Sequence, residues 1–438
     1  MKPINVGLLG IGTVGGGVFT VLSRNQGEIT RRAGRPIRIS VVADKDTERA
    51  QRITQGQARV IDDAFAVVAD PQVDIVVELI GGCTVAKDLV LKAIAHGKHV
   101  VTANKALLAM HGNEIFAAAQ QQGVMVAFEA AVAGGIPIIK ALREGLTANR
   151  IEWIAGIING TSNFILSEMR DKGLTFEAAL QDAQRRGYAE ADPTFDIEGI
   201  DAAHKLTIIA AISFGIPMQF DKAYTEGIAK LAAEDIRYAE ELGYRIKLLG
   251  ITKRVPEGIE LRVHPTLIPA RRLIANVEGV MNAILVKGDA VGPTLYYGAG
   301  AGAEPTASAV VADLVDVTRM HTADPEHRVP HLAFQPDALS DVSILPIAEV
   351  ETAYYLRLRV ADRPGVLADI TRILADLEIS IEALVQKQPH AGEDSVDIIM
   401  LTHRTREKRV NAAMERIEAL PVVDGKVIRL RLEQLNGD

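Results

Sequence analysis

The stretch Val6-Gly-Leu-Leu-Gly10-Ile-Gly12-Thr-Val-Gly15 sets the architecture of the first third of the chain. Its apolar first half predicts a buried strand, and apolar residues at helical spacing after Gly15 predict a helix. Between them, Gly10 permits a tight turn, Gly12 lets a pyrophosphate approach the backbone, and Gly15 allows close helix packing. The helix N-terminus also favours an anion. We therefore expect a dinucleotide to bind at Gly10, Gly12, Thr13, Val14 and Gly15.

Short β-branched runs alternate with helical patterns across this region, which is typical of βαβ units and a parallel sheet. We expect strands at residues 6–9, 37–43, 75–80, 99–102 and 124–128. Helices are expected at residues 86–96 and 112–122, each followed by a glycine that can end it. The predicted fold class is α/β, with a Rossmann-type dinucleotide-binding domain over residues 1–130.

An acidic and a basic residue, Asp44 and Lys45, follow the second expected strand. An acid at this place usually binds the ribose 2′-hydroxyl of NAD, whereas a nearby base accommodates the 2′-phosphate of NADP. Both NAD and NADP therefore remain open as the cofactor.

The composition favours small-molecule chemistry. The 438 residues carry a net charge of −8 and no long block of Lys or Arg, which argues against nucleic acid and anionic membranes as partners. We find no run of about 18 apolar residues and no signal-peptide pattern, so no membrane span or export is expected. The single cysteine, Cys83, fits a reducing cytoplasm. It is interpreted as a small, partly buried residue, because nothing places a base beside it.

From residue 131 to about 304 the pattern predicts an α+β substrate and dimerisation domain. Strands are expected at residues 261–265 and 283–287, and helices at 162–172 and 202–214. A helix at residues 307–320 is expected to return to the dinucleotide-binding domain, within about 305–325. Four prolines between residues 325 and 346 then indicate a linker over residues 326–350.

Residues 351–438 predict a small ferredoxin-like domain. We expect strands at residues 354–360, 380–388, 395–402 and 427–432, and helices at 365–376 and 406–420. The resulting order is βαββαβ.

A lysine, Lys105, follows the expected strand at residues 99–102, in the segment Val100-Val-Thr-Ala-Asn104-Lys105. In open α/β sheets, ligands bind beyond the carboxyl ends of the strands, so this position favours contact with cofactor or substrate. Taken alone, Lys105 would be better explained as a solvated loop lysine.

Residues 187–205 are dense in carboxylates and lead into an apolar helix. Asp201 and Lys205 are four residues apart and should share one helix face. Acids that stabilise a helix N-terminus and one ion pair would explain these two residues. They would not explain the four further acids in the preceding loop, which include Glu190 and Asp196.

Two stretches resemble the signature of the homoserine dehydrogenase family, namely Gly156-Ile-Ile-Asn159-Gly160-Thr161-Ser162-Asn163-Phe164-Ile165-Leu166 and Gly187-Tyr-Ala-Glu190-Ala-Asp192-Pro193. The second continues to Asp196, Asp201 and Lys205, and the match extends from Val6 to about residue 320 in the family's order. The chain begins at the dinucleotide turn and so resembles the monofunctional form. It departs from its relatives at Cys83-Thr84-Val85, where a proline is common.

The resemblance implies NAD(P)-dependent reduction of L-aspartate 4-semialdehyde to L-homoserine, a step toward threonine, methionine and isoleucine. It makes Lys205 the proton donor, which would also stabilise the alkoxide. Lys105 would bridge cofactor and substrate. Residues implied to bind the substrate are Glu190, Asp196 and Asp201, and those implied to lie against the nicotinamide are Gly187 and Gly302.

The resemblance also implies a monovalent cation site, usually for sodium. The matching ligands are Glu129 and the carbonyls of Val132, Gly134 and Ile136. From spacing alone this segment reads only as a glycine-rich turn. Transition metals are not expected, because the ten histidines have no paired-ligand spacing.

The segment Asp362-Arg-Pro-Gly365 resembles the opening of an ACT domain, in which a strand turns sharply into a helix. Such domains generally bind amino acids between two copies, so we expect threonine inhibition and a homodimer or homotetramer. A purely structural oligomerisation domain is the alternative reading.

Two other functions compete. Aspartate-semialdehyde dehydrogenase acts through a cysteine thioester, for which Cys83 is the only candidate. A non-catalytic amino-acid sensor could be built from a dinucleotide-binding domain and an ACT domain, but it would not need the two lysines Lys105 and Lys205.

Overall fold

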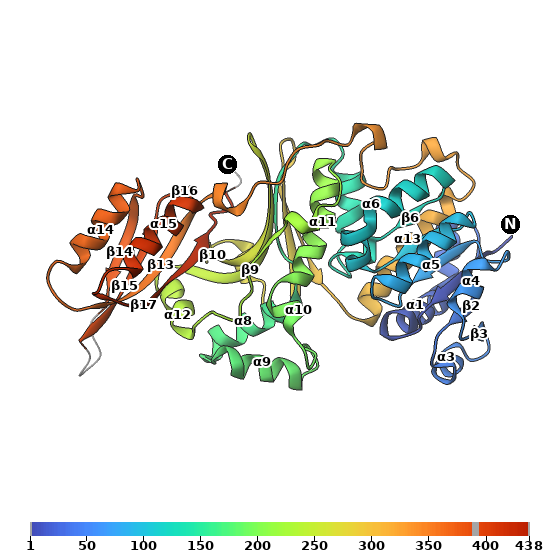
Figure 1. Cartoon of the computed structure of the whole chain (residues 1–438). Coiled ribbons are helices and arrows are strands. Elements are labelled where there is room, and N and C mark those ends of the chain that lie inside the picture. The colour runs from blue at the N-terminus through green and yellow to red at the C-terminus, as the bar shows by residue number, and fades with distance from the viewer. Residues whose placement is uncertain (1, 388–393, 437–438) are drawn as a thin grey trace. The chain divides into compact units, whose positions relative to one another are not determined.

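The computed structural model describes residues 2–387 and 394–436, and the chain divides into two compact units (Figure 1). The first unit contains Met1–Gly160, Asp201–Ala223 and Val280–Val342. The second contains Thr161–Ile200, Tyr224–Gly279 and Ser343–Asp438. Each unit is therefore assembled from three separate stretches of sequence.

A six-stranded parallel sheet forms the centre of the first unit, in the order β3-β2-β1-β4-β5-β6. Its strands are β1 (Ile4–Leu9), β2 (Ile37–Ala43), β3 (Arg59–Ile61), β4 (Ile75–Glu78), β5 (His99–Thr102) and β6 (Val126–Ala127). The order reverses between β1 and β4, which is where dinucleotides bind in doubly wound sheets. The expected α/β Rossmann-type fold is confirmed.

Helices cover this sheet in two groups. One group is α1 (Thr13–Arg24), α2 (Gln26–Ala33) and α13 (Ala303–Met320), and the other is α4 (Ala64–Ala69), α5 (Thr84–Ala95) and α6 (Lys105–Gln122). A further short helix, α3 (Thr47–Thr54), follows β2. Apolar residues of α1 and α13 share one core with the sheet, so the late helix α13 packs with the N-terminal elements.

The start of α6 differs from our expectation of residue 112. The helix begins at Lys105, because the side chain of Asn104 accepts a hydrogen bond from the backbone N–H of Leu107 and caps it. Gly112 lies inside the helix, where an added Cβ would come within 3.2 Å of the Met218 side chain. Lys105 is thus the first residue of a helix and not part of a loop.

The remainder of the first unit contains β12, β11 and β7, which pair antiparallel in that order, and one deeply buried helix, α11. The bounds are β7 (Ile151–Ile157), β11 (Met281–Gly288), β12 (Gly292–Ala299) and α11 (Ile200–Phe214). Short turns are η1 (Glu129–Ala131), α7 (Ile138–Lys140), the π-helical η2 (Ala141–Gly145), η3 (Phe220–Lys222), η5 (Pro325–His327) and η6 (Pro336–Ala338). Helix α11 is apolar on nearly all sides, which suits a buried helix.

A mixed sheet in the order β9-β10-β17-β13-β15-β14 organises the second unit, with β8 beside β10 and β16 beside β13. Its strands are β8 (Tyr224–Thr225), β9 (Tyr244–Val255), β10 (Gly258–Pro269), β13 (Glu351–Ala361), β14 (Ile381–Gln386), β15 (Ser395–Thr402), β16 (Thr405–Arg406) and β17 (Val423–Leu432). Its helices and turns are α8 (Gly160–Lys172), α9 (Phe176–Arg185), α10 (Thr194–Ile197), α12 (Ala233–Glu241), η4 (Leu273–Asn276), η7 (Ile347–Glu349), α14 (Val366–Asp376) and α15 (Glu407–Glu418).

The C-terminal part of this unit has the expected βαββαβ order, and its ferredoxin-like fold is confirmed. Apolar faces of α14 and α15 pack on β13, β14, β15 and β17 around one core. Gly365 precedes α14 with φ +97°, a conformation that glycine adopts readily. Residue 388, the last of an expected strand, lies outside the described residues.

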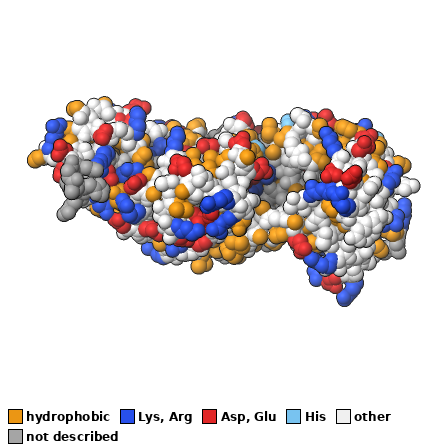
Figure 2. Space-filling model, turned by 90° about the horizontal axis from the view of Figure 1, so that it is seen from below, with side chains coloured by type: hydrophobic (Ala, Val, Ile, Leu, Met, Phe, Trp, Pro, Cys, Tyr) orange, Lys and Arg blue, Asp and Glu red, His pale blue; other side chains and the backbone are white. Residues whose placement is uncertain are grey.

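Charges of both signs are mixed over the molecular surface. On the face shown in Figure 2, Lys and Arg side chains lie among Asp and Glu side chains. Within the described residues, the helices are all too short or too polar to cross a bilayer.

The contact between α1 and α13 generates a stability prediction. An added Cβ at Gly17 would lie 2.4 Å from the carbonyl oxygen of Ala303, so Gly17→Ala must push the two helices apart. We expect it to lower the free energy of unfolding by about 1–3 kcal/mol, the usual cost of overpacking. Urea unfolding followed by the fluorescence of Trp153, the only tryptophan, measures this.

The matched control is Gly27→Ala in α2, where an added Cβ meets nothing within 4 Å. That variant should be as stable as the wild type or more stable, because alanine favours helix. Equal effects of the two substitutions would contradict the proposed packing constraint.

Candidate active site

The glycine turn after β1 has the geometry of a phosphate-binding site. Gly10 has φ +87°, and an added Cβ at Gly15 would lie 2.1 Å from the carbonyl oxygen of Gly10. At Gly12, in contrast, an added Cβ would meet nothing within 4 Å. No side chain caps α1 at its N-terminus. The helix therefore presents its first amides to an incoming anion, and the expected dinucleotide pyrophosphate fits this turn.

Asp44 lies at the carboxyl end of β2 and is tied to the same turn. Its carboxylate accepts hydrogen bonds from the backbone N–H of Ile11 at 2.7 Å and of Asp46 at 2.9 Å. Lys45 beside it is exposed. Both residues are thus placed next to the turn, where the ribose of a dinucleotide would lie.

Lys105 is positioned by the end of β5. The Asn104 side chain caps α6 and donates to the carbonyl of Gly82 at 2.7 Å. The backbone N–H of Asn104 donates to the Thr102 hydroxyl, which in turn donates to the buried Glu78 at 2.7 Å. This chain of hydrogen bonds fixes the first turn of α6 at the carboxyl end of the sheet.

Asp201 is the centre of the candidate site. Its carboxylate, only 5% exposed, receives the Lys205 ammonium at 2.7 Å and the Lys105 ammonium at 3.2 Å. The Asn159 side-chain amide donates to it at 2.8 Å, and Lys205 also donates to the carbonyl of Ile158 at 2.8 Å. Three distant parts of the chain, the start of α6, the end of β7 and the first turn of α11, therefore meet at one carboxylate.

The electrostatics of this cluster keep Asp201 charged. Burial alone would raise the pKa of Asp201, but Lys205, Lys105 and the hydrogen bonds from Lys205 and Asn159 lower it to about 2. The adjacent His204 imidazole is buried, which lowers its pKa to about 4, so it is neutral at pH 7. An ionised carboxylate thus holds two ammonium groups close together in a partly buried place. Such a pair can donate protons or hydrogen bonds to a developing oxyanion.

The structure brings together only some of the expected site residues. Lys105, Asp201 and Lys205 meet in the first unit. Gly187, Glu190 and Asp196 belong to the second unit. There, Glu190 is exposed, its carbonyl accepts from Gln184 at 3.1 Å, and the carbonyl of Asp196 accepts from Ser162 at 3.0 Å.

Gly302 and the Glu129 segment lie in the first unit. Gly302 has φ +127° and directly precedes α13, the helix that packs on α1. The buried Glu129 carboxylate accepts hydrogen bonds from the backbone N–H groups of Ile139 and Lys140. Burial, and then the neighbouring Asp313, raise the pKa of Glu129 to about 7.

Two site residues were not expected from the sequence. Asn159 lies within a family signature, but the sequence pattern indicates no role for it. Glu78 lies within an expected strand and is not indicated by any motif. Burial raises the pKa of Glu78, and its carboxylate accepts hydrogen bonds from the Ile80 and Gly81 backbone. A charged residue at the end of an otherwise apolar strand was the available signal for Glu78.

Comparisons with known families match almost the whole chain. A model of the homoserine dehydrogenase NAD-binding domain matches residues 10–129, a homoserine dehydrogenase model matches residues 137–315, and an ACT domain model matches residues 354–422. These three ranges include the dinucleotide turn, the Asp201 cluster and the C-terminal module up to the start of β17.

Individual relatives of the chain are homoserine dehydrogenases as well. A homoserine dehydrogenase of Pseudomonas aeruginosa is 64% identical over 436 residues, 100% of each chain. The crystal structure of a homoserine dehydrogenase from Thiobacillus denitrificans is 73% identical, covers 100% of this chain and 99% of its own, and has a TM-score of 0.96. A hyperthermophilic archaeal homoserine dehydrogenase in complex with NADPH is 25% identical, covers 72% of this chain and 98% of its own, and has a TM-score of 0.62. The chain belongs to the homoserine dehydrogenase family, with an NAD(P)-binding domain, a catalytic domain and an ACT domain.

Proposed function

We propose that this NAD(P)-dependent oxidoreductase reduces L-aspartate 4-semialdehyde to L-homoserine with the Asp201 cluster as its catalytic centre. The observation that carries the proposal is the convergence of the Lys205 and Lys105 ammonium groups on one buried carboxylate. A bound nicotinamide would supply the hydride that reduces the aldehyde carbon. The aldehyde oxygen then gains negative charge and needs a proton.

Lys205 is the proposed donor of that proton. An ammonium group has three N–H donors, and the contacts with Asp201 and Ile158 use two of them. The third can point at the substrate oxygen, where the positive charge stabilises the alkoxide before the proton moves. Asp201 keeps the lysine oriented, and Lys105 is proposed to bridge cofactor and substrate.

The other end of the substrate carries an ammonium and a carboxylate. Glu190 and Asp196 are proposed to accept hydrogen bonds from the ammonium, and Gly187 and Gly302 to leave room for the nicotinamide. Support for these roles comes from their place in the family's motif and from the exposure of Glu190.

We propose that both NAD and NADP are accepted. The Asp44 carboxylate is in position for a ribose hydroxyl, and the exposed Lys45 could pair with a 2′-phosphate. An archaeal relative binds NADPH. Asp44 and Lys45 are consecutive in the chain, so the two cofactors would compete for the same site.

A sodium ion is proposed at Glu129, Val132, Gly134 and Ile136. This segment is buried and turns through two consecutive residues of positive φ, Ala133 at +54° and Gly134 at +47°. Such a turn is kept only where the surroundings hold it, and its carbonyls are hard oxygen ligands that suit an alkali cation.

The domain division proposed from the sequence is 1–130, 131–304, 326–350 and 351–438, with residues 305–325 returning to the first domain. We further propose that threonine binds the ACT domain and inhibits the enzyme, in a homodimer or homotetramer. The support is Gly365, which opens the N-terminus of α14 toward a ligand carboxylate.

Lys205→Ala tests the catalytic proposal. Without the ammonium the alkoxide has no proton donor, so the rate of NADPH oxidation with aspartate semialdehyde should fall by about a hundredfold or more. Cofactor binding, measured by NADPH fluorescence, should remain. The control is Lys222→Ala, an exposed lysine after α11, which should keep full activity. Wild-type turnover by Lys205→Ala would refute the assigned role.

Cys83→Ser separates this enzyme from a dehydrogenase that forms a thioester. Burial and the nearby Glu78 raise the pKa of the Cys83 thiol, so it stays protonated and is a poor nucleophile. We expect kcat within about twofold of the wild type, since a partly buried cysteine tolerates this change. Complete loss of turnover in a folded Cys83→Ser protein would favour the thioester enzyme.

Gly365→Asp tests the regulatory proposal. The new carboxylate would occupy the N-terminus of α14 and repel the carboxylate of threonine. We expect an active enzyme whose inhibition by threonine is weakened about tenfold or more, through lost charge-assisted hydrogen bonds. Gly425→Asp is the matched control, because Gly425 also has positive φ in the same domain. Equal threonine inhibition in all three proteins would leave the ACT domain with a structural role only.

A further inference from the structure

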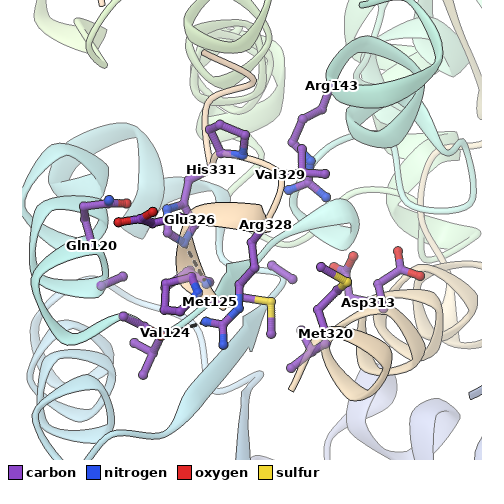
Figure 3. Close-up of a pocket in the computed structure, with 18 of the residues that line it drawn as sticks. Gln120, Val124, Met125, Arg143, Asp313, Met320, Glu326, Arg328, Val329 and His331 are labelled. Atoms are coloured by element: carbon purple, nitrogen blue, oxygen red, sulfur yellow. Dashed lines mark hydrogen bonds between the residues drawn. The ribbon is translucent and has the colours of Figure 1, made fainter. Parts of the chain in front are cut away.

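A separate cavity of about 400 Å³ lies in the first unit, a volume typical of a small-molecule site (Figure 3). Four segments enclose it: residues 119–127 at the end of α6 and in β6, the turn η2, the second half of α13, and residues 325–336. Its described lining residues include none of the catalytic and cofactor-binding residues proposed above. The cavity is therefore distinct from the candidate active site.

Two guanidinium groups enter the cavity (Figure 3). One belongs to Arg143 of η2, and the other to Arg328 in the wall formed by residues 325–336. Arg328 donates to the carbonyls of Gly123 at 2.7 Å and Ala323 at 2.8 Å, and burial lowers its pKa. Arg143, whose side chain is 11% exposed, has an ion pair with the adjacent Glu144 at 3.2 Å. Both groups are desolvated cations that retain N–H donors for an anion.

A third basic side chain, His331, also lines the cavity. Its Nε2 accepts from the backbone N–H of Val126 at 3.1 Å, so the neutral ring carries its proton on Nδ1. Burial, followed by Arg143 and Arg328, lowers the pKa of His331 to about 4. The positive charge of both guanidinium groups thus acts on this imidazole, which is neutral at pH 7.

A carboxylate faces this positive side. Asp313 of α13 is buried, and it accepts the backbone N–H of Glu129 at 2.8 Å through one oxygen. The neighbouring Asp316 is already paired with Lys140 and Arg319. Two further acids of the lining, Glu144 and Glu326, are exposed, so Asp313 is the buried carboxylate available to a ligand cation.

The remaining wall is largely apolar. The side chains of Val124, Met125, Met320 and Val329 surround the space between the charged groups (Figure 3). Methionine side chains adapt to aliphatic and thioether groups of different shape.

We propose that this cavity binds a free α-amino acid with an aliphatic or thioether side chain. The ligand carboxylate binds Arg143 and Arg328, its ammonium binds Asp313, and its side chain packs against the two methionines. A simple carboxylic acid fits less well, because it would bring an anion near Asp313 without the compensating ammonium.

A ligand in this cavity would stabilise the position of α11, the helix that carries Asp201 and Lys205. Its effect on catalysis rests on the proposed role of Lys205. The segment that forms one cavity wall continues to Phe334 and Ser340. The ring of Phe334 packs on Gly215, and the backbone N–H of Ser340 donates to the Gly215 carbonyl at 2.7 Å. Gly215 directly follows α11, so a ligand that orders this segment steadies the helix that carries Lys205 and Asp201.

The test is titration calorimetry on the full chain with L-leucine and with 4-methylpentanoate, which is leucine without its amino group. We expect leucine to bind and 4-methylpentanoate to bind at least tenfold more weakly, because it leaves Asp313 without a partner. Absence of leucine binding, or equal binding of both compounds, overturns the proposal. Calorimetry reads binding directly, so a failed catalytic role for Lys205 would not affect the result.

Two variants locate the site. Arg143→Gln and Asp313→Asn should each weaken leucine binding about tenfold or more, and the asparagine keeps an oxygen for the Glu129 N–H. Arg271→Gln, an exposed arginine of the second unit, is the matched control and should bind normally. Gly365→Asp should also bind leucine normally. Binding that survives both cavity variants, or is lost only in Gly365→Asp, would place leucine in the ACT domain and refute the proposal.

Discussion

The buried Asp201 carboxylate is the constraint on which the active site depends. Two ammonium groups that close to each other would repel strongly in a partly desolvated place. One ionised carboxylate between them removes that cost, and Asn159 supplies a further hydrogen bond. The cluster therefore holds positive charge at the place where, in the proposed reaction, a substrate oxygen becomes negative.

Sheet topology explains how three distant segments reach that carboxylate. Lys105 follows β5, and parallel strands place their following residues at one edge of the sheet. Asn159 follows β7, and Asp201 begins α11, which is buried because almost every side of it is apolar. Because nearly every side of α11 is buried, contacts on all sides fix its position. The rigidity of α11 is thus what fixes the distance between Lys205 and its partners.

Much of this could be predicted from local patterns, and the failures have identifiable causes. Strands at residues 37–43, 99–102 and 395–402 were predicted with their observed bounds, because apolar runs with clear turn residues on both sides define them. The start of α6 was wrong, since a side-chain cap at Asn104 outweighed the helix-weakening Gly112. Asn159 could not be assigned a role, because its partner Asp201 is 42 residues away and only tertiary structure brings them together. The i,i+4 pair of Asp201 and Lys205 was predictable because helix geometry alone produces it.

The ACT domain is integrated into the second unit by buried charge. Strand β17 pairs with β10, and Arg431, 1% exposed, bonds to Glu407 of the same domain and to Glu226 outside it. Arg262 of β10 is paired with both Glu260 and Glu433. Removing the domain would leave Arg262 with one carboxylate fewer and Glu226 without Arg431, and it would uncover the edge of β10 that pairs with β17, where unpaired backbone groups favour aggregation. In a truncated enzyme, a loss of regulation could therefore not be separated from a loss of stability. A substitution at the N-terminus of α14 leaves this network of ion pairs in place.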